Sequence, residues 1–181
     1  TKEMVLLPML LCGYAWLIGE LRLENLLYLV GGLIVMNVFV AMLGVHAGMT
    51  YGNSRSAIGT SLGTAFFLFL GVYVCIRTMI AFSGSFQFQL LPFAALMLGG
   101  GVGLFVSLGW RNPSAAIGVA ALTCPFATFY AITSSLIEPP QTLGVFLTIA
   151  ATYGFTTAAM LIPALYEFDV ATGRTTGGGD E

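Results

Sequence analysis

Residues 26–48, LLYLVGGLIVMNVFVAMLGVHAG, decide the fold of this chain. The segment contains no Asp, Glu, Lys or Arg, and its length suits the about 20 apolar residues with which a helix crosses the hydrocarbon core of a bilayer. A strand of a membrane β-barrel would alternate apolar and polar residues over about 10 positions, whereas this segment is apolar on every side. It therefore predicts a transmembrane α-helix.

The composition of the whole chain extends this prediction. Of the 181 residues, 57% are hydrophobic and 8% are charged, and the mean hydropathy is +0.93. A soluble domain carries about 25% charged residues, so the surface of this protein must face membrane lipid. Six Lys and Arg against eight Asp and Glu provide no basic field, and nucleic acid is excluded as a partner.

Apolar runs separated by short polar segments divide the chain into six predicted spans. They cover residues 4–19, 26–48, 57–82, 90–108, 115–137 and 142–165. Because the separating segments are short, consecutive spans should pack antiparallel. We predict an all-α integral membrane protein, a bundle of about six transmembrane helices in one domain over residues 1–165, followed by a polar tail over residues 166–181.

The orientation of the bundle follows from its basic residues, since Lys and Arg are retained on the cytoplasmic side. In a six-span chain, Lys2, Arg55, Arg111 and Arg174 all fall on one side, and Arg22 falls on the other. Both termini and the polar tail should therefore be cytoplasmic, and the protein should be multi-pass.

Glycine pairs at helical spacing occur in three of the predicted spans. They are Gly44 and Gly48, Gly59 and Gly63, and Gly99 and Gly103. Small residues let helix backbones approach closely in lipid, where no hydrophobic drive brings apolar helices together. We expect these faces to pack helices within the bundle, with a dedicated dimer interface as the alternative.

Polar residues at membrane depth are costly and are candidate functional residues. Arg77 lies near the end of the third span, where its side chain can snorkel to the interface or line a substrate path, paired with a carboxylate such as Glu138 or Glu20. Asn37 and His46 lie nine residues apart on the second span, so at 100° per residue they do not share a face. Interfacial packing is the expected role of His46.

Nothing in the sequence predicts catalysis. Residues 59–63 match G-x-S-x-G, but that motif needs a strand-to-helix turn, and this copy lies within an apolar helical run. The sole histidine, His46, precedes Ser61, so no base follows the hydroxyl. The cysteines lie singly in apolar runs without metal-ligand spacing. We predict no catalytic residues, no metal site and no cofactor, and hence not an enzyme.

Several segments resemble a known family. The step Gly19–Glu20 and residues 44–49 (GVHAGM) and 53–64 (NSRSAIGTSLGT) are similar to the membrane part of type-2 ATP-binding-cassette (ABC) exporter permeases. Residues 168–176 (FDVATGRTT) look like the C-terminal tail of a bacterial branch. The resemblance implies a permease half in the bacterial inner membrane that pairs with a second half and with two cytoplasmic ATPase subunits, and exports substrate by alternating access.

The chain departs from this family at its cytoplasmic face. Residues 1–4 are too short for the amphipathic helix that usually precedes the first span, and residues 49–56 offer only a short turn where the family has a coupling helix. If that turn contacts the ATPase, the coupling residues are Tyr51, Asn53 and Arg55, with Arg55 meeting an acidic groove. The alternative is that Arg55 only fixes the topology.

Two functions of different classes follow. The first is a permease subunit of an ABC-type exporter, in which a partner hydrolyses ATP. The second is a non-catalytic accessory or scaffold subunit of a larger membrane complex, which contacts other membrane subunits along its glycine faces. A cytoplasmic docking surface for an ATPase distinguishes the first from the second.

Overall fold

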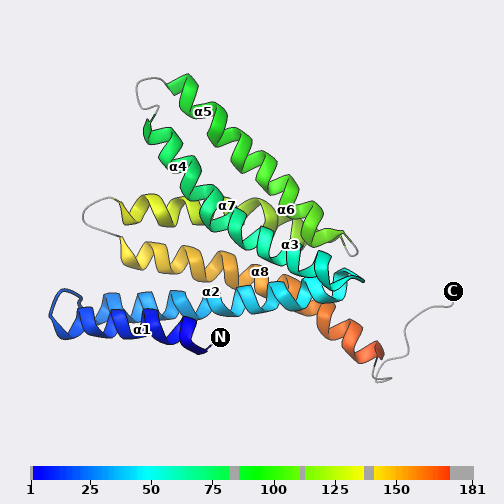
Figure 1. Cartoon of the computed structure of the whole chain (residues 1–181), viewed down its shortest axis with the longest axis horizontal. Coiled ribbons are helices and arrows are strands. Elements are labelled where there is room, and N and C mark those ends of the chain that lie inside the picture. The colour runs from blue at the N-terminus through cyan, green and yellow to red at the C-terminus, as the bar shows by residue number, and fades with distance from the viewer. Residues whose placement is uncertain (1, 82–85, 111–112, 137–140, 172–181) are drawn as a thin grey trace.

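The computed structural model describes residues 2–81, 86–110, 113–136 and 141–171 of the chain (Figure 1). Within these ranges every regular element is a helix, which confirms the predicted all-α class. The elements are α1 (Lys2–Leu17), α2 (Leu23–Thr50), α3 (Ser54–Phe66), η1 (Phe67–Gly71), α4 (Val72–Ala81), α5 (Phe86–Ala94), η2 (Ala95–Gly99), α6 (Gly100–Gly109), α7 (Ala115–Ser135) and α8 (Thr142–Ala171).

Five helical rods in the described ranges are long and apolar enough to cross a membrane. They are Leu23–Thr50, Ser54–Ala81, Gln89–Gly109, Ala115–Ser135 and Thr142–Leu165. The second and third rods each contain a short π-helical segment, η1 and η2. The first predicted span forms a shorter apolar helix, Leu6–Leu17, so the described ranges hold five helices of full spanning length and one short one.

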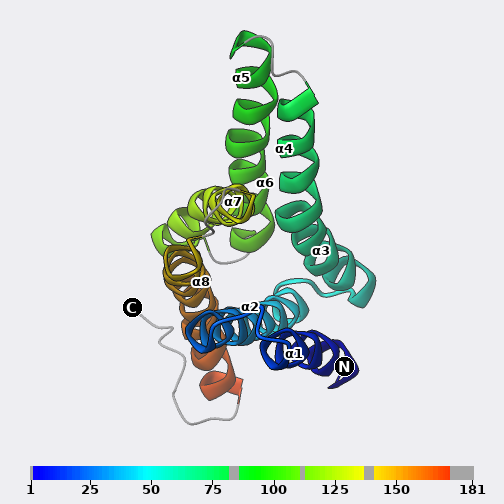
Figure 2. The ribbon, with the colours of Figure 1, turned by 90° about the vertical axis from the view of Figure 1, so that its left-hand side faces the viewer.

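Consecutive helical rods run antiparallel, as the short connections between the predicted spans indicate (Figure 1). Helix α2 lies between α1 and α8, and α7 lies against α8. The hairpin formed by α3–α4 and α5–α6 leans away from this layer, and its α4 and α5 ends stand clear of α2 (Figure 2). The end of α2, the start of α3 and the end of α6 lie at one end of the molecule (Figure 1).

Glycine stops the first helix and turns the chain into the second. Gly19 has a φ of +83°, a left-handed conformation that glycine adopts without steric cost. The Glu20 N–H donates to the Ala15 carbonyl at 3.2 Å, and the Gly19 N–H donates to the Trp16 carbonyl at 3.0 Å. These two bonds make a Schellman motif, so the Gly19–Glu20 step is a helix stop.

The core lies where α2, α7, α8 and η1 meet, around Tyr153. The Tyr153 side chain is fully buried, and its ring packs edge-on against Phe39 of α2 with centroids 4.7 Å apart. It also stacks on Phe69 of η1 at 6.5 Å. In lipid, such close packing supplies much of the association between helices.

At none of the six paired glycines does another part of the described chain approach the backbone closely. A Cβ atom added at any of them would meet nothing within 4 Å. These are Gly44, Gly48, Gly59, Gly63, Gly99 and Gly103.

At other glycines a side chain from elsewhere in the bundle lies close to the helix backbone. A Cβ on Gly31 would lie 2.8 Å from the Phe146 ring, and a Cβ on Gly101 would lie 2.9 Å from Leu122. Gly100 is covered by the Phe67 ring. Successive residues of a helix point about 100° apart, so Gly100 and Gly101 face their neighbours while Gly99 does not.

Candidate functional site

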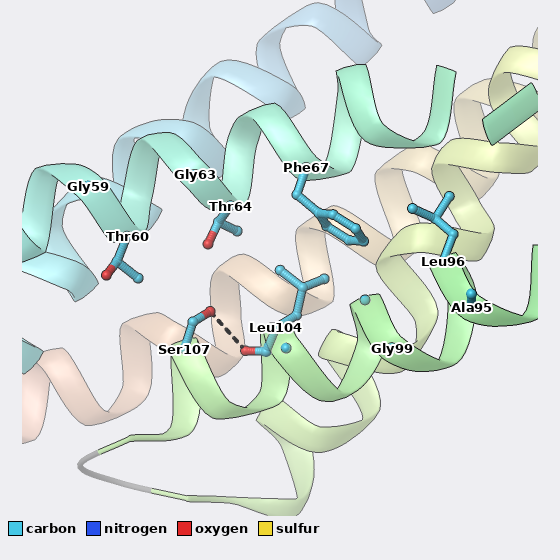
Figure 3. A pocket seen from close by; sticks show the side chains of 12 residues that line it. Gly59, Thr60, Gly63, Thr64, Phe67, Ala95, Leu96, Gly99, Leu104 and Ser107 are labelled. Carbon is cyan, nitrogen blue, oxygen red and sulfur yellow. Dashed lines mark hydrogen bonds between the residues drawn. The ribbon is translucent and has the colours of Figure 1, made fainter. Parts of the chain in front are cut away.

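A groove of about 540 Å³ runs between the α3–η1 rod and the η2–α6 rod (Figure 3). We call it the α3/α6 groove. It is lined by Gly59, Thr60, Gly63, Thr64, Phe67, Ala95, Leu96, Gly99, Gly100, Gly103, Leu104 and Ser107. Two of the predicted glycine pairs thus lie on its opposite walls, and α3 and α6 touch each other only sparsely.

One part of the groove carries hydroxyl groups. Thr60 and Thr64 of α3 and Ser107 of α6 line it from opposite sides (Figure 3). The Ser107 hydroxyl donates to the Leu104 carbonyl of its own helix at 3.1 Å. Thr64 is only 5% exposed, and its hydroxyl is directed into the groove (Figure 3).

The other part of the groove is apolar. Phe67, the first residue of η1, extends its ring toward the opposite rod, where Leu96 and Ala95 of η2 lie (Figure 3). The two π-helical segments therefore border the same part of the groove. Single π-helical turns inside α-helices are frequent at functional sites.

The predicted coupling turn forms a tight corner, the α2–α3 corner (residues 51–53), at the hydroxyl end of the groove. The Tyr51 hydroxyl donates to the Ser107 carbonyl at 3.1 Å. The His46 Nε2–H donates to the Leu108 carbonyl at 2.8 Å. Both acceptors belong to the last turn of α6, whose carbonyls have no partner within the helix. The corner is therefore tied to the end of α6.

Asn53 and Arg55 complete the corner. Asn53 caps α3 because its side-chain oxygen accepts from the Arg55 backbone N–H at 3.0 Å, an arrangement that stabilises a helix start. The Arg55 side chain is exposed. The structure thus brings the three predicted coupling residues together, with Tyr51 and Asn53 holding the backbone and Arg55 facing outward.

The remaining intramembrane candidates lie apart. Asn37 is exposed on α2 and donates to the Leu33 carbonyl of its own helix at 2.7 Å. His46 is 5% exposed on a different face of the same helix. Arg77 is exposed on α4, and Glu138, one of its suggested partners, lies outside the described residues. These three side chains form no common site.

A buried hydroxyl cluster between α7 and α8 is absent from the sequence predictions. Thr128 and Tyr153 share a hydrogen bond, and the Cys124 Sγ and Thr156 Oγ1 atoms are 3.2 Å apart. The spacing of these residues in the sequence could have indicated the cluster, because Cys124 and Thr128 are four residues apart and Tyr153 and Thr156 are three apart. Residues at these spacings share a helix face.

Ser61, at the centre of the G-x-S-x-G match, lies within α3 and donates to the Ile58 carbonyl at 3.2 Å. In the described part of the chain, no three His, Cys, Asp or Glu side chains gather as a metal site would require. No protein-family model matches the sequence, and no curated protein or solved structure matches it.

Proposed function

We propose that this chain is the membrane permease subunit of an ABC-type exporter in the bacterial inner membrane. It works with a separate ATPase subunit and a second permease half. The observation that carries the proposal is the α2–α3 corner, which joins three helices and presents an exposed arginine at one end of the bundle.

The α2–α3 corner can transmit a movement at the end of the bundle to three helices. A push on residues 51–53 acts directly on the end of α2 and on the start of α3. The hydrogen bonds from Tyr51 and His46 carry the same push to the end of α6. Helices α3 and α6 are the two walls of the α3/α6 groove, so a partner that moves the corner changes the groove between them.

Arg55 supplies the charge for docking such a partner. The guanidinium group is permanently charged and forms bidentate hydrogen bonds with carboxylates. Its backbone is fixed by the Asn53 cap, and its side chain is exposed. An acidic groove on an ATPase subunit is the complementary surface.

The test is purification of the chain in mild detergent from its native membrane, with identification of the proteins that co-migrate. We expect an ATPase with a phosphate-binding loop in stoichiometric amount. Arg55→Glu should reduce its recovery by about tenfold or more, since like-charge contacts cost several kcal/mol. Arg55→Lys should retain part of it. Arg22→Glu, an exposed charge reversal at the opposite end, is the matched control.

The unpacked glycine faces favour a second function, an accessory subunit of a larger membrane complex. A Cβ atom at any of the six paired glycines would meet nothing within 4 Å, so these faces leave room of the kind in which partner helices pack. Recovery of a large assembly without an ATPase, unchanged by Arg55→Glu, would support this function and reject the permease.

A further inference from the structure

We propose that the α3/α6 groove binds a neutral amphiphile from the membrane. Its hydrogen-bonding group lies at Thr64, and its apolar part extends toward Phe67. The inference does not depend on the exporter assignment, because binding is a property of this chain without any ATPase.

The first observation is the hydroxyl group of Thr64. Many hydroxyl side chains in the helices donate to a carbonyl of the preceding turn, as in Thr78, Thr123, Thr133, Thr156 and Thr157. Among the described residues, the Thr64 hydroxyl has no such partner. It is directed instead into the groove, although the residue is only 5% exposed (Figure 3).

An unpaired hydroxyl at this depth is costly. Thr64 lies ten residues after Ser54, the first residue of α3, which places it about 15 Å along the helix axis. The Thr64 oxygen is open to the groove, since no fully buried side-chain oxygen of the described residues lacks a partner, and a donor left unpaired against apolar lipid costs about 1–3 kcal/mol. A ligand that hydrogen-bonds to Thr64 recovers this free energy, so the groove favours a ligand with a polar group at that point.

The second observation is that the groove is neutral. Its twelve lining residues include no Asp, Glu, Lys, Arg or His. A charged group would lose its hydration in the groove without gaining a counter-charge, at a large cost in free energy. The ligand should therefore be uncharged in the part that enters.

The third observation is the division of the groove into a hydroxyl part and an apolar part. Thr60 and Ser107 lie near Thr64, whereas Leu96 lies near Phe67 at the other end (Figure 3). The volume of about 540 Å³ is within the range of about 300–1,000 Å³ that small-molecule sites occupy. An amphiphile whose head is a hydroxyl or carbonyl group fits both parts.

The experiment is photolabelling of the purified full chain in phosphatidylcholine nanodiscs. The probe is a diacylglycerol with a diazirine on one acyl chain, which is uncharged and carries a hydroxyl and two ester carbonyls. We expect labelling of the peptides that contain Phe67 and Leu96. Thr64→Val, which removes only the hydroxyl, should lower it about fivefold, the equivalent of about 1 kcal/mol.

Two further variants separate hydroxyl chemistry from shape. Thr64→Ser should keep most of the labelling, and Gly63→Leu should abolish it by filling the groove. Thr123→Val is the matched control, since Thr123 is exposed and donates to the carbonyl of Val119 in its own helix. Circular dichroism should show the same helix content in every variant.

Three outcomes would overturn the inference. One is wild-type protein without labelling at the groove peptides, and another is equal labelling of wild type and Thr64→Val. The third is a Gly63→Leu variant that keeps its labelling but changes the mass of the solubilised particle. That result would assign the groove to a transmembrane helix of another subunit.

Discussion

At the scale of single residues, hydroxyl groups hold the described helices together more often than charges do. The clearest case is the hydrogen bond between Thr128 of α7 and Tyr153 of α8, at the centre of the core. The Thr128 hydroxyl also donates to the Cys124 carbonyl at 3.0 Å. If the Thr128–Tyr153 bond is broken, Thr128 keeps a hydrogen-bond partner and the Tyr153 hydroxyl does not. Together with the Cys124 Sγ to Thr156 Oγ1 contact at 3.2 Å, the bond joins α7 and α8 through polar side chains.

We expect Tyr153→Phe to destabilise the fold because it removes this bond and keeps the ring packed on Phe39. Interhelical hydrogen bonds in membranes contribute about 0.6 kcal/mol on average and up to about 1.7. A double-mutant cycle of Tyr153→Phe and Thr128→Val, measured by unfolding in mixed micelles, should give a coupling energy in this range. Purely additive effects of the two substitutions would contradict it.

At the scale of elements, the fit of η1 against α6 depends on Gly100. Its Cα lies beneath the Phe67 ring, and a Cβ at that point would overlap the ring. The α5–α6 rod can approach α3 and η1 there only because the side chain is a hydrogen atom. Gly103, three residues further along the same helix, has nothing within 4 Å of its Cβ position.

Gly100→Ala should therefore lower the thermal stability of the detergent-solubilised protein, whereas Gly103→Ala should leave it nearly unchanged. Overpacking of a close contact typically costs about 1–3 kcal/mol. Because the clash is with one side chain, Phe67→Ala in the Gly100→Ala background should restore part of the loss relative to Phe67→Ala alone. Equal effects of Gly100→Ala and Gly103→Ala would show that Phe67 does not set this approach.

The same glycines show why helices were predictable from the sequence and their faces were not. Long apolar runs such as residues 26–48 determine that a helix forms, because the unpaired backbone has no alternative in lipid. Which face is buried depends on the neighbours and on the exact turn. The π-helical segment η2 ends at Gly99, and in the run Gly99–Gly101 only Gly100 and Gly101 lie close to another side chain, a difference that the glycine spacing alone does not show.

The candidate site shows the same division between local and tertiary information. The sequence could suggest Tyr51, Asn53 and Arg55, because they lie in a short turn after an apolar run. The acceptor of the Tyr51 hydroxyl, 56 residues away in α6, depends on the packing of two helices that are distant in sequence. Thr64 was not predicted for the same reason, since its missing partner is a property of the open groove.

At the scale of the whole molecule, the alternation of helices separates two ends of the bundle. The α2–α3 corner and the end of α6 lie at one end, and the turn between α1 and α2 lies at the other (Figure 1). Lys and Arg near short loops set the orientation of a membrane protein. Arg55 belongs to the first end, and Arg22 to the second, where Glu20 and Glu24 accompany it.

This distribution predicts that the α2–α3 corner is cytoplasmic and that the α1–α2 turn faces the opposite side. In a chain whose three cysteines are replaced by alanine, Glu20→Cys should react with a membrane-impermeant maleimide in intact bacterial cells. Ser56→Cys, exposed on the first turn of α3, should react only after the cells are permeabilised. The helix order requires opposite results at the two positions, so equal accessibility would contradict the fold. Exchanged accessibility would keep the fold and reverse the orientation, and it would place Arg55 out of reach of a cytoplasmic ATPase.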